Sequence, residues 1–281
     1  MNLFEDMSKH PGVKVVSQGN GLYAANFTRS VFRKGLWDEM TLHARGLFLD
    51  KAGHVYGRGY EKFFDYQGET LHYPLTASIK QNGYLAIMFA YRGELLVYSK
   101  SGDTAYGRNA RKILLSSETT PIFQEWCGTG VSLLFEILDP RDPHIIKRYS
   151  NQPTAVFLDQ INNETGIISE VDEFPIHSET IVKNQKYNLL GERELDELVT
   201  WSNVLRSEGL VVREPNGTMF KMETPYYRKV KALRAQVNKL LHGKPTELDA
   251  AITPELARSV VVKNIAGADQ INMPKLMDKI A

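Results

Sequence analysis

Four charged residues lie inside or at the ends of segments that are otherwise apolar. They are Lys80 at the end of LTASIK, Glu136 in LLFEIL, Glu208 before GLVV and Lys221 in MFKM. Charged groups in such strands cost free energy unless they are paired or functional. With the guanidinium of Arg45, they supply cations for a polyphosphate and carboxylates for a divalent metal. The residue types therefore indicate phosphoryl-transfer chemistry.

Lys80 raises the central question, because a lysine at a strand end is usually a solvated surface residue. It is followed by Gln81, Asn82 and Gly83, and the glycine allows a sharp turn or a close approach of the backbone to a ligand. From these four residues alone, a surface lysine opening a hairpin is the simpler interpretation. The alternative is a lysine nucleophile, whose amine must first lose its proton. Partial burial and nearby cations such as Lys100 favour that loss.

Several common catalytic sites have no counterpart in the sequence. It contains no phosphate-binding lysine loop of the GxxxxGK type, no GxGxxG in the context of a dinucleotide-binding fold, and no defensible Ser-His-Asp spacing. The seven histidines include no HExxH-like pair, which makes a zinc hydrolase a poor interpretation. We interpret the histidines and Cys127 as structural residues.

Composition places the chain among ordinary globular proteins. Its 281 residues are 42% hydrophobic and 24% charged, with a net charge of +1, so any basic surface must be local. A single cysteine allows no internal disulfide and fits a reducing compartment. The sequence shows no secretory signal and no apolar run long enough for a membrane span. We expect a cytoplasmic protein without membrane contact, and the sequence indicates no obligate protein partner.

Hydrophobic patterning predicts a mixture of strands and helices. Short strands are expected at 13–17, 22–27, 44–50, 54–60, 86–91, 94–99, 131–139 and 155–162, and a hairpin at 208–223. Helical spacing is found at 110–128 and 192–209, and from 225 onward, including 246–252 and 273–281. The predicted fold class is α+β, with a mainly antiparallel body at 1–235 and a short helical C-terminal appendage at 236–281.

Ordered segments around Lys80 resemble the T4 RNA ligase 1 family of covalent nucleotidyltransferases. The segments that carry the resemblance are ARGLFLD (44–50), YEKFFDY (60–66), KQNG (80–83), SKSG (99–102), LFEIL (134–138), HIIKRY (144–149) with AVFLDQINNETG (155–166), SEGLVV (207–212) and FKME (220–223). A lone KxxG is weak, but this order at these spacings is specific. The similarity covers roughly residues 20 to 235.

The resemblance implies an antiparallel nucleotidyltransferase (adenylyltransferase) domain that uses ATP and Mg²⁺ or Mn²⁺. It implies that Lys80 is the catalytic nucleophile and carries AMP covalently. It also implies a nucleotide-binding set, which is Arg45, Lys62, Phe64, Gly83, Lys100, Glu136, Glu208 and Lys221. Within that set, Glu136 and Glu208 are the expected metal ligands.

The implied reaction is the ATP-dependent joining of RNA ends. AMP would pass from Lys80 to an RNA 5′-phosphate, and an RNA 3′-hydroxyl would displace it, as in the repair of broken RNA, including tRNA. The alternatives are a capping-type nucleotidyltransferase that uses GTP, a DNA ligase, and a non-catalytic RNA-binding module that uses a strip such as PYYRKVK.

Two positions depart from the family pattern. Asn82 stands where the phage enzyme has aspartate, and Glu223 stands where the last motif usually has a second lysine. Residues two apart on a strand share a face, so Glu223 should point the same way as Lys221. We predict that a neighbouring cation, Arg228 or Lys229, neutralises Glu223; metal binding by Glu223 is the alternative.

Two groups of basic residues remain beside these motifs. Lys231, like Arg228 and Lys229, could replace the missing phosphate-binding lysine. Arg148 in IIKRY is interpreted as a solvated basic residue at a strand end.

Overall fold

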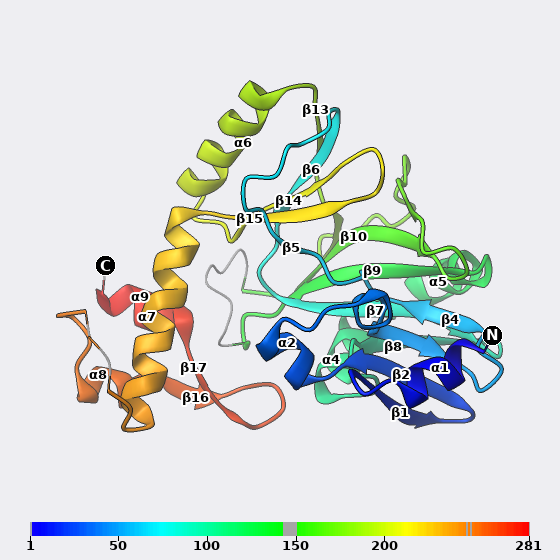
Figure 1. Cartoon of the computed structure of the whole chain (residues 1–281), viewed down its shortest axis with the longest axis horizontal. Coiled ribbons are helices and arrows are strands. Elements are labelled where there is room, and N and C mark those ends of the chain that lie inside the picture. The colour runs from blue at the N-terminus through cyan, green and yellow to red at the C-terminus, as the bar shows by residue number, and fades with distance from the viewer. Residues whose placement is uncertain (1, 143–150, 246, 248, 281) are drawn as a thin grey trace. The chain divides into compact units, whose positions relative to one another are not determined.

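A computed structural model describes residues 2–142, 151–245, 247 and 249–280 (Figure 1). Contacts between Cα atoms divide the chain into two compact units. Unit 1 consists of Met1–Phe63, Tyr84–Ile137 and Ala155–Lys183, and unit 2 of Phe64–Gly83, Leu138–Thr154 and Asn184–Ala281. No helix in the described part of the chain is long and apolar enough to cross a membrane.

Unit 1 contains two mainly antiparallel sheets. The first has the order β1-β2-β3-β4, and the second has the order β11-β10-β9-β7-β8, with β12 parallel to β10. The strands are β1 Val13–Gly19, β2 Leu22–Phe27, β3 Arg45–Leu49, β4 Val55–Arg58, β7 Tyr84–Tyr91, β8 Glu94–Ser99, β9 Val131–Leu138, β10 Thr154–Asn162, β11 Ile168–Ser169 and β12 Ile181–Lys183. The helices are α1 Leu3–Lys9, α2 Arg29–Lys34, α3 Glu39–His43, α4 Ala105–Leu114 and α5 Thr119–Gly128.

The predicted hairpin between β7 and β8 has the backbone that its turn residues favour. Arg92 and Gly93 both have positive φ, 50° and 81°, as a two-residue turn of the primed type requires. Alternation along β7 then places Ile87 and Phe89 in one buried cluster and Ala86 and Met88 in another.

Unit 2 is built on a third sheet, with the order β13-β6-β14-β15-β5. Its strands are β5 Phe64–Asp65, β6 Leu75–Lys80, β13 Lys186–Leu189, β14 Gly209–Arg213 and β15 Met219–Glu223. All of its pairings are antiparallel except β15 with β5. Helix α6 (Glu192–Val204) buries Leu195 and Leu198 in a core with Leu75 and Leu210. The sheets confirm the predicted α+β class.

The C-terminal part of unit 2 has a separate core. Helices α7 (Pro225–Leu241), α8 (Pro254–Ser259) and α9 (Met273–Ile280) enclose it, together with the hairpin β16 (Val261–Lys263) and β17 (Asp269–Ile271). This hairpin was not predicted. The expected boundary between residues 235 and 236 falls within α7.

The predicted helical segment at 246–252 is wrong for its described residues. The Asp249 carboxylate accepts a hydrogen bond from the Ala251 N–H at 3.1 Å, and its carbonyl accepts one from the Ile252 N–H at 2.8 Å. Aspartate commonly forms such local turns, which compete with helix formation.

Candidate nucleotidyltransferase site

Lys80 is the last residue of β6, which lies between β13 and β14 in the sheet of unit 2. Its register partner on β14 is Gly209, which immediately follows Glu208. The Lys80 Nζ lies 2.9 Å from Glu208 Oε1, and the lysine side chain is only 24% exposed. Lys80 is therefore not the solvated surface lysine of the simpler interpretation.

Glu208 is the acid that both Lys80 and Asn82 contact. It is 7% exposed, and its second oxygen, Oε2, accepts a hydrogen bond from Asn82 Nδ2 at 2.9 Å. An aspartate at position 82 would place two carboxylates in contact, and like charges at such a distance repel. The amide of Asn82 is thus matched to Glu208, which gives this departure from the family pattern a physical reason.

Gly209 fixes how closely the strands approach beside Glu208. Its φ is 151°, and a Cβ built on it would lie 1.9 Å from the Met222 carbonyl oxygen. Since that neighbour is backbone, only glycine fits here. Glu208 and Gly209 therefore combine a buried acid with a glycine that lets β14 lie directly against β15.

Tyr227 is a residue of this group that the sequence analysis did not single out. Burial, followed by the charges of Glu208 and Glu223, raises the pKa of the Tyr227 hydroxyl, which also donates a hydrogen bond to Glu208. The Thr224 hydroxyl accepts a hydrogen bond from the Tyr227 N–H at 3.1 Å and so caps α7. A Thr-Pro pair is a recognisable helix start and could have shown which residues open α7.

The last motif, on β15, contains two ion pairs. Lys221 Nζ lies 3.1 Å from Asp65 Oδ1, and Lys231 Nζ lies 2.7 Å and 2.8 Å from the two carboxylate oxygens of Glu223. Lys221 Nζ also lies 4.0 Å from Glu223 Oε1, because residues two apart on a strand lie on the same face.

A neighbouring cation does neutralise Glu223, but the choice of Arg228 or Lys229 was wrong. The cation is Lys231, which lies one helical turn after Tyr227 and places its Nζ 5.6 Å from the Tyr227 ring centroid. Residues four apart share a helix face, so Lys231 lies on the same side of α7 as Tyr227.

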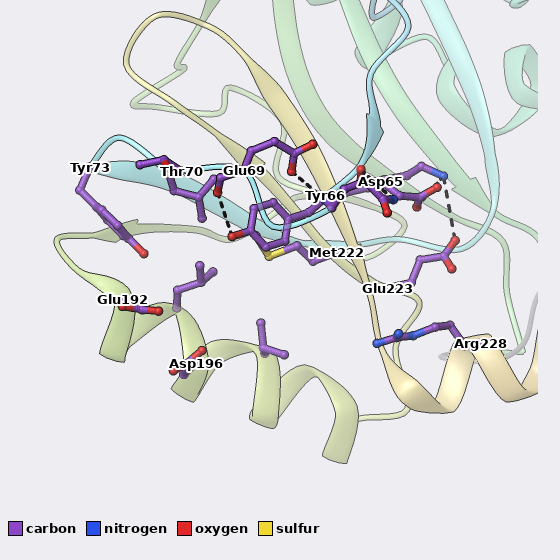
Figure 2. A pocket seen from close by; sticks show the side chains of 15 residues that line it. Asp65, Tyr66, Glu69, Thr70, Tyr73, Glu192, Asp196, Met222, Glu223 and Arg228 are labelled. Carbon is purple, nitrogen blue, oxygen red and sulfur yellow. Dashed lines mark hydrogen bonds and ion pairs between the residues drawn. The ribbon is translucent and has the colours of Figure 1, made fainter. Parts of the chain in front are cut away.

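A pocket of about 730 Å³ lies within unit 2, beside the residues of the last motif (Figure 2). Arg228 lines it, together with Lys221 and five carboxylates, which are Asp65, Glu69, Glu192, Asp196 and Glu223. Neither Lys80 nor Glu208 is among its lining residues. Acids therefore outnumber cations in the lining of this pocket.

The candidate residues of unit 1 form a second group around Arg45, the first residue of β3. Arg45 donates a hydrogen bond from Nη1 to the Tyr60 carbonyl at 3.0 Å. Burial lowers the pKa of the Arg45 guanidinium, and the charge of Glu136 on β9 opposes that shift. Lys100 stays exposed at the surface, yet desolvation by the surrounding protein and then the charge of Arg45 lower its pKa.

Asn26 connects the backbone segments that carry Arg45 and Lys100. Its Nδ2 donates to the Lys100 carbonyl at 2.9 Å, and its Oδ1 accepts from the Gly46 N–H at 2.9 Å. Two cations are thus held near each other, with Glu136 as the nearby acid. Such an arrangement favours the binding of an anion.

Lys62 and Phe64 make contacts outside the two groups described above. Lys62 Nζ donates to the Phe63 carbonyl at 2.5 Å and lies 5.3 Å from the Trp37 ring centroid. Phe64, the first residue of β5, is 41% exposed and pairs in register with Phe220. Gly83 follows Asn82 in the segment between β6 and β7.

The donor set limits how a metal could be held. No three His, Cys, Asp or Glu side chains among the described residues gather closely enough to form a metal site. Glu136 lies in unit 1 and Glu208 in unit 2. Single carboxylates fit a magnesium ion that takes most of its ligands from substrate phosphates and water.

Two remaining sequence interpretations can be placed. Cys127 is buried, and burial raises the pKa of its thiol to about 12, in keeping with a structural role. Arg148 lies outside the described residues.

Comparison with known proteins gives a family and a fold. The T4 RNA ligase 1 family model, described as RNA ligase, matches residues 43–227. Two forms of an archaeal ATP-dependent RNA ligase align with TM-scores of 0.62 and 0.59 at 15% and 14% identity, covering 83% and 84% of this chain. A protein of Aquifex aeolicus, provisionally named an ATP-dependent DNA ligase, aligns over 85% of this chain and 66% of its own, with a TM-score of 0.60 at 16% identity.

These identities show a shared fold and no more, and the alignment covers 64% of each archaeal chain. No match was found among curated proteins. The family model, in contrast, covers more than half of this chain and includes the segments of Arg45, Lys80, Glu136, Glu208 and Lys221. The chain belongs to the T4 RNA ligase 1 family.

Proposed function

We propose that the protein is an ATP-dependent RNA ligase in which Lys80 is the nucleophile. The observation that carries the proposal is the contact of Lys80 with Glu208, an acid that Asn82 also contacts. A lysine fixed at a strand end, with its amine directed at one buried acid, has the defined position that a nucleophile needs.

The first step joins AMP to the enzyme. The Lys80 amine, after losing its proton to water, attacks the α-phosphorus of ATP; an N–P bond forms as the bond to pyrophosphate breaks. Arg45, Lys62, Lys100 and Lys221 are proposed to bind phosphate oxygens, and Phe64 and Gly83 to contact the nucleotide. A magnesium or manganese ion, when bound, would neutralise phosphate charge, with Glu136 and Glu208 as its protein ligands.

The second and third steps seal the RNA. The AMP passes from Lys80 to the 5′-phosphate of an RNA, and a 3′-hydroxyl then displaces AMP to form the phosphodiester. We propose a role in the repair of broken RNA, with tRNA as a candidate substrate. Consumption of ATP and a single buried thiol are consistent with action in the cytoplasm.

Labelling with α-labelled ATP and magnesium tests the first step. The chain should retain the label, and Lys80→Ala should abolish it. Lys186→Ala is the matched control, because Lys186 lies on β13 in the same sheet, and this variant should label normally. Labelling of Lys80→Ala at the normal level would refute the assignment.

The same assay separates the alternatives. A capping-type enzyme would take label from GTP instead of ATP, and an RNA-binding module would take none. Sealing is then measured on single-stranded, nicked-duplex and broken stem-loop RNAs, with nicked DNA as the test for a DNA ligase.

A further inference from the structure

Helix α2 (dark blue in Figure 1) and the residues next to it form a surface in unit 1 that the proposed catalytic steps do not use. The helix is short, with Thr28 as its N-cap and Gly35 ending it at φ 66°. Its one buried residue, Val31, packs toward Gly12 and Thr41. We call the rest of this surface the α2 platform; it consists of Phe27, Arg29, Phe32, Arg33, Lys34, Leu36 and Trp37.

The platform exposes large apolar side chains. Phe32 is 61% exposed and Leu36 is 59% exposed. Phe32 lies nearly parallel to Phe27, with ring centroids 6.4 Å apart and planes at 14°, and edge-on to Trp37 at 84°. Phe27 and Trp37 are in turn edge-to-face at 5.0 Å. Phe32 is therefore an exposed ring supported by two others.

Two arginines of α2 lie on the same side of the helix as that ring. Arg29 lies three residues before Phe32 and four before Arg33, so it shares a helix face with both of them; Lys34 is the last residue of the helix. All three cations are exposed, and none of them has a carboxylate partner among the described residues. No acidic residue occurs between positions 27 and 37.

The nearby acids contact histidines instead of the platform cations. Asp38 contacts His10 at 3.1 Å, and Glu61 contacts His43 at 2.5 Å. Glu39 lies 4.0 Å from His43. The platform is therefore a locally positive surface on a chain whose net charge is only +1.

Lys62 connects the platform to the proposed nucleotide-binding residues. The Lys62 Nζ lies 5.3 Å from the Trp37 ring centroid, and the backbone N–H of Lys62 donates a hydrogen bond to the Leu42 carbonyl at 2.9 Å. Lys62 belongs to the YEKFFDY segment, in which we propose a phosphate contact. An RNA end on the platform would thus lie beside a residue that serves the nucleotide.

We propose that the α2 platform binds single-stranded RNA. A base stacks on Phe32, while Arg29 and Arg33 contact the flanking phosphates. Stacking on an exposed ring accepts any base but requires one that is not already stacked in a duplex, so the surface selects unpaired RNA. Charge complementarity favours a polyanion over an apolar protein partner. The proposal rests on the proposed function for the choice of RNA as ligand.

Binding of a fluorescent, single-stranded 12-nucleotide RNA to the full chain tests the platform by anisotropy. Phe32→Ala should weaken binding about tenfold, since a base–aromatic stack contributes on the order of 1–3 kcal/mol. Phe32→Tyr should restore it, because the ring is kept. Arg29→Ser/Arg33→Ser should weaken binding further and reduce the slope of log affinity against log salt by about 1.4, the value for two lost phosphate contacts.

Matched controls use other exposed side chains outside the platform. Val204 on α6 is 73% exposed, so Val204→Ala controls for loss of an apolar surface group. Lys51→Ser/Lys112→Ser removes two exposed cations of unit 1 outside the platform. Both variants should bind the RNA within about twofold of the unchanged protein.

Three results would overturn the proposal. They are normal binding by Phe32→Ala, equal loss of affinity in the control variants, and equal effects of Phe32→Ala on single-stranded and blunt duplex RNA. If the platform variants lost binding to anionic lipid vesicles but kept normal RNA binding, the surface would be assigned to membranes instead. Labelling of Lys80 is measured in parallel: if the platform variants lose RNA binding but the protein never takes label from ATP, the proposed ligase reaction fails and the platform stands.

Discussion

The two units carry their charged candidate residues in different ways. In unit 2, Lys80 makes a direct ion pair with Glu208, so the cation and the acid are fixed against each other. In unit 1, desolvation lowers the pKa of both Arg45 and Lys100. The charge of Arg45 lowers the pKa of Lys100 further, and the charge of Glu136 opposes the shift of Arg45. The first arrangement positions one amine. The second leaves two cations whose charge a bound anion would stabilise.

The largest effect is expected when the direct pair of unit 2 is broken. Glu208→Gln removes the negative charge that orients Lys80 and leaves one acceptor oxygen where two carboxylate oxygens contact Lys80 and Asn82. We expect the initial rate of Lys80 labelling from ATP to fall about 100-fold, since small displacements of a reacting group cost that much.

Glu214 provides the matched control for Glu208. It is also buried, and it follows the far end of β14, where its carboxylate accepts hydrogen bonds from the His72 N–H at 2.7 Å and from the His72 ring. Glu214→Gln should lower the melting temperature but leave labelling within about twofold of normal. Equal losses of labelling in both variants would mean that Glu208 acts only through stability.

The next effect concerns the cation pair of unit 1. Lys100→Met should lower the labelling rate about tenfold through a higher KM for ATP, because one phosphate-binding cation is lost. The melting temperature should not fall, because Lys100 is exposed and lies near another cation. Lys112→Met, on the exposed side of α4, should change neither quantity. A fall in kcat with an unchanged KM would contradict a role in phosphate binding.

Sequence patterns were sufficient to predict many strands of unit 1 and the order of the site segments, but not short strands such as β16 and β17. Alternation predicted β7 and β8, and Arg92-Gly93 marked their turn. The contact between Lys80 and Glu208 depends on the register that sets Lys80 opposite Gly209, and neither strand alone contains that information. The resemblance grouped the two residues, but only the structure supplies the contact.

Other features could not be predicted because tertiary contacts decide them. The partner of Glu223 depends on which face of α7 lies toward β15, so that Lys231 was preferred over two residues closer in sequence. The turn at Asp249 overrode the helical spacing of its segment. The three rings of the α2 platform are spread over eleven residues with no simple period.

A smaller effect is expected at the last motif, where the ion pair of Glu223 with Lys231 can be broken or reversed by substitution. Glu223→Lys restores the family's second lysine, but it places a third cation beside Lys221 and Lys231. We expect labelling near normal, with stability lower by about 1 kcal/mol. Glu223→Lys/Lys231→Glu should recover that stability in urea unfolding. Loss of labelling by a folded Glu223→Lys protein would show that the acid has its own catalytic role.

The smallest effect, on the pH dependence of stability, is expected at the pair His43 and Glu61 in unit 1, because solvent reaches both side chains. The hydrogen bond to Glu61 raises the pKa of His43, and the same bond lowers the pKa of Glu61. A raised histidine pKa stabilises the fold fully below the unfolded value near 6.5, and this contribution is lost as pH rises through the folded pKa. The lowered Glu61 pKa contributes stability above the unfolded value, and this is lost as pH falls. Their joint contribution is therefore greatest at mildly acidic pH.

The free energy of unfolding in urea, measured at pH 5.5, 6.5, 7.5 and 8.5, tests this expectation. The unchanged protein should lose more stability between pH 6.5 and 8.5 than His43→Gln, which cannot lose a proton from this pair. The difference should be small, because the two side chains are 42% and 50% exposed and solvent screens their interaction. His177→Gln, at an exposed histidine of the same unit, should keep the slope of the unchanged protein. Equal slopes for all three proteins would show that the short contact between His43 and Glu61 does not couple proton binding to folding.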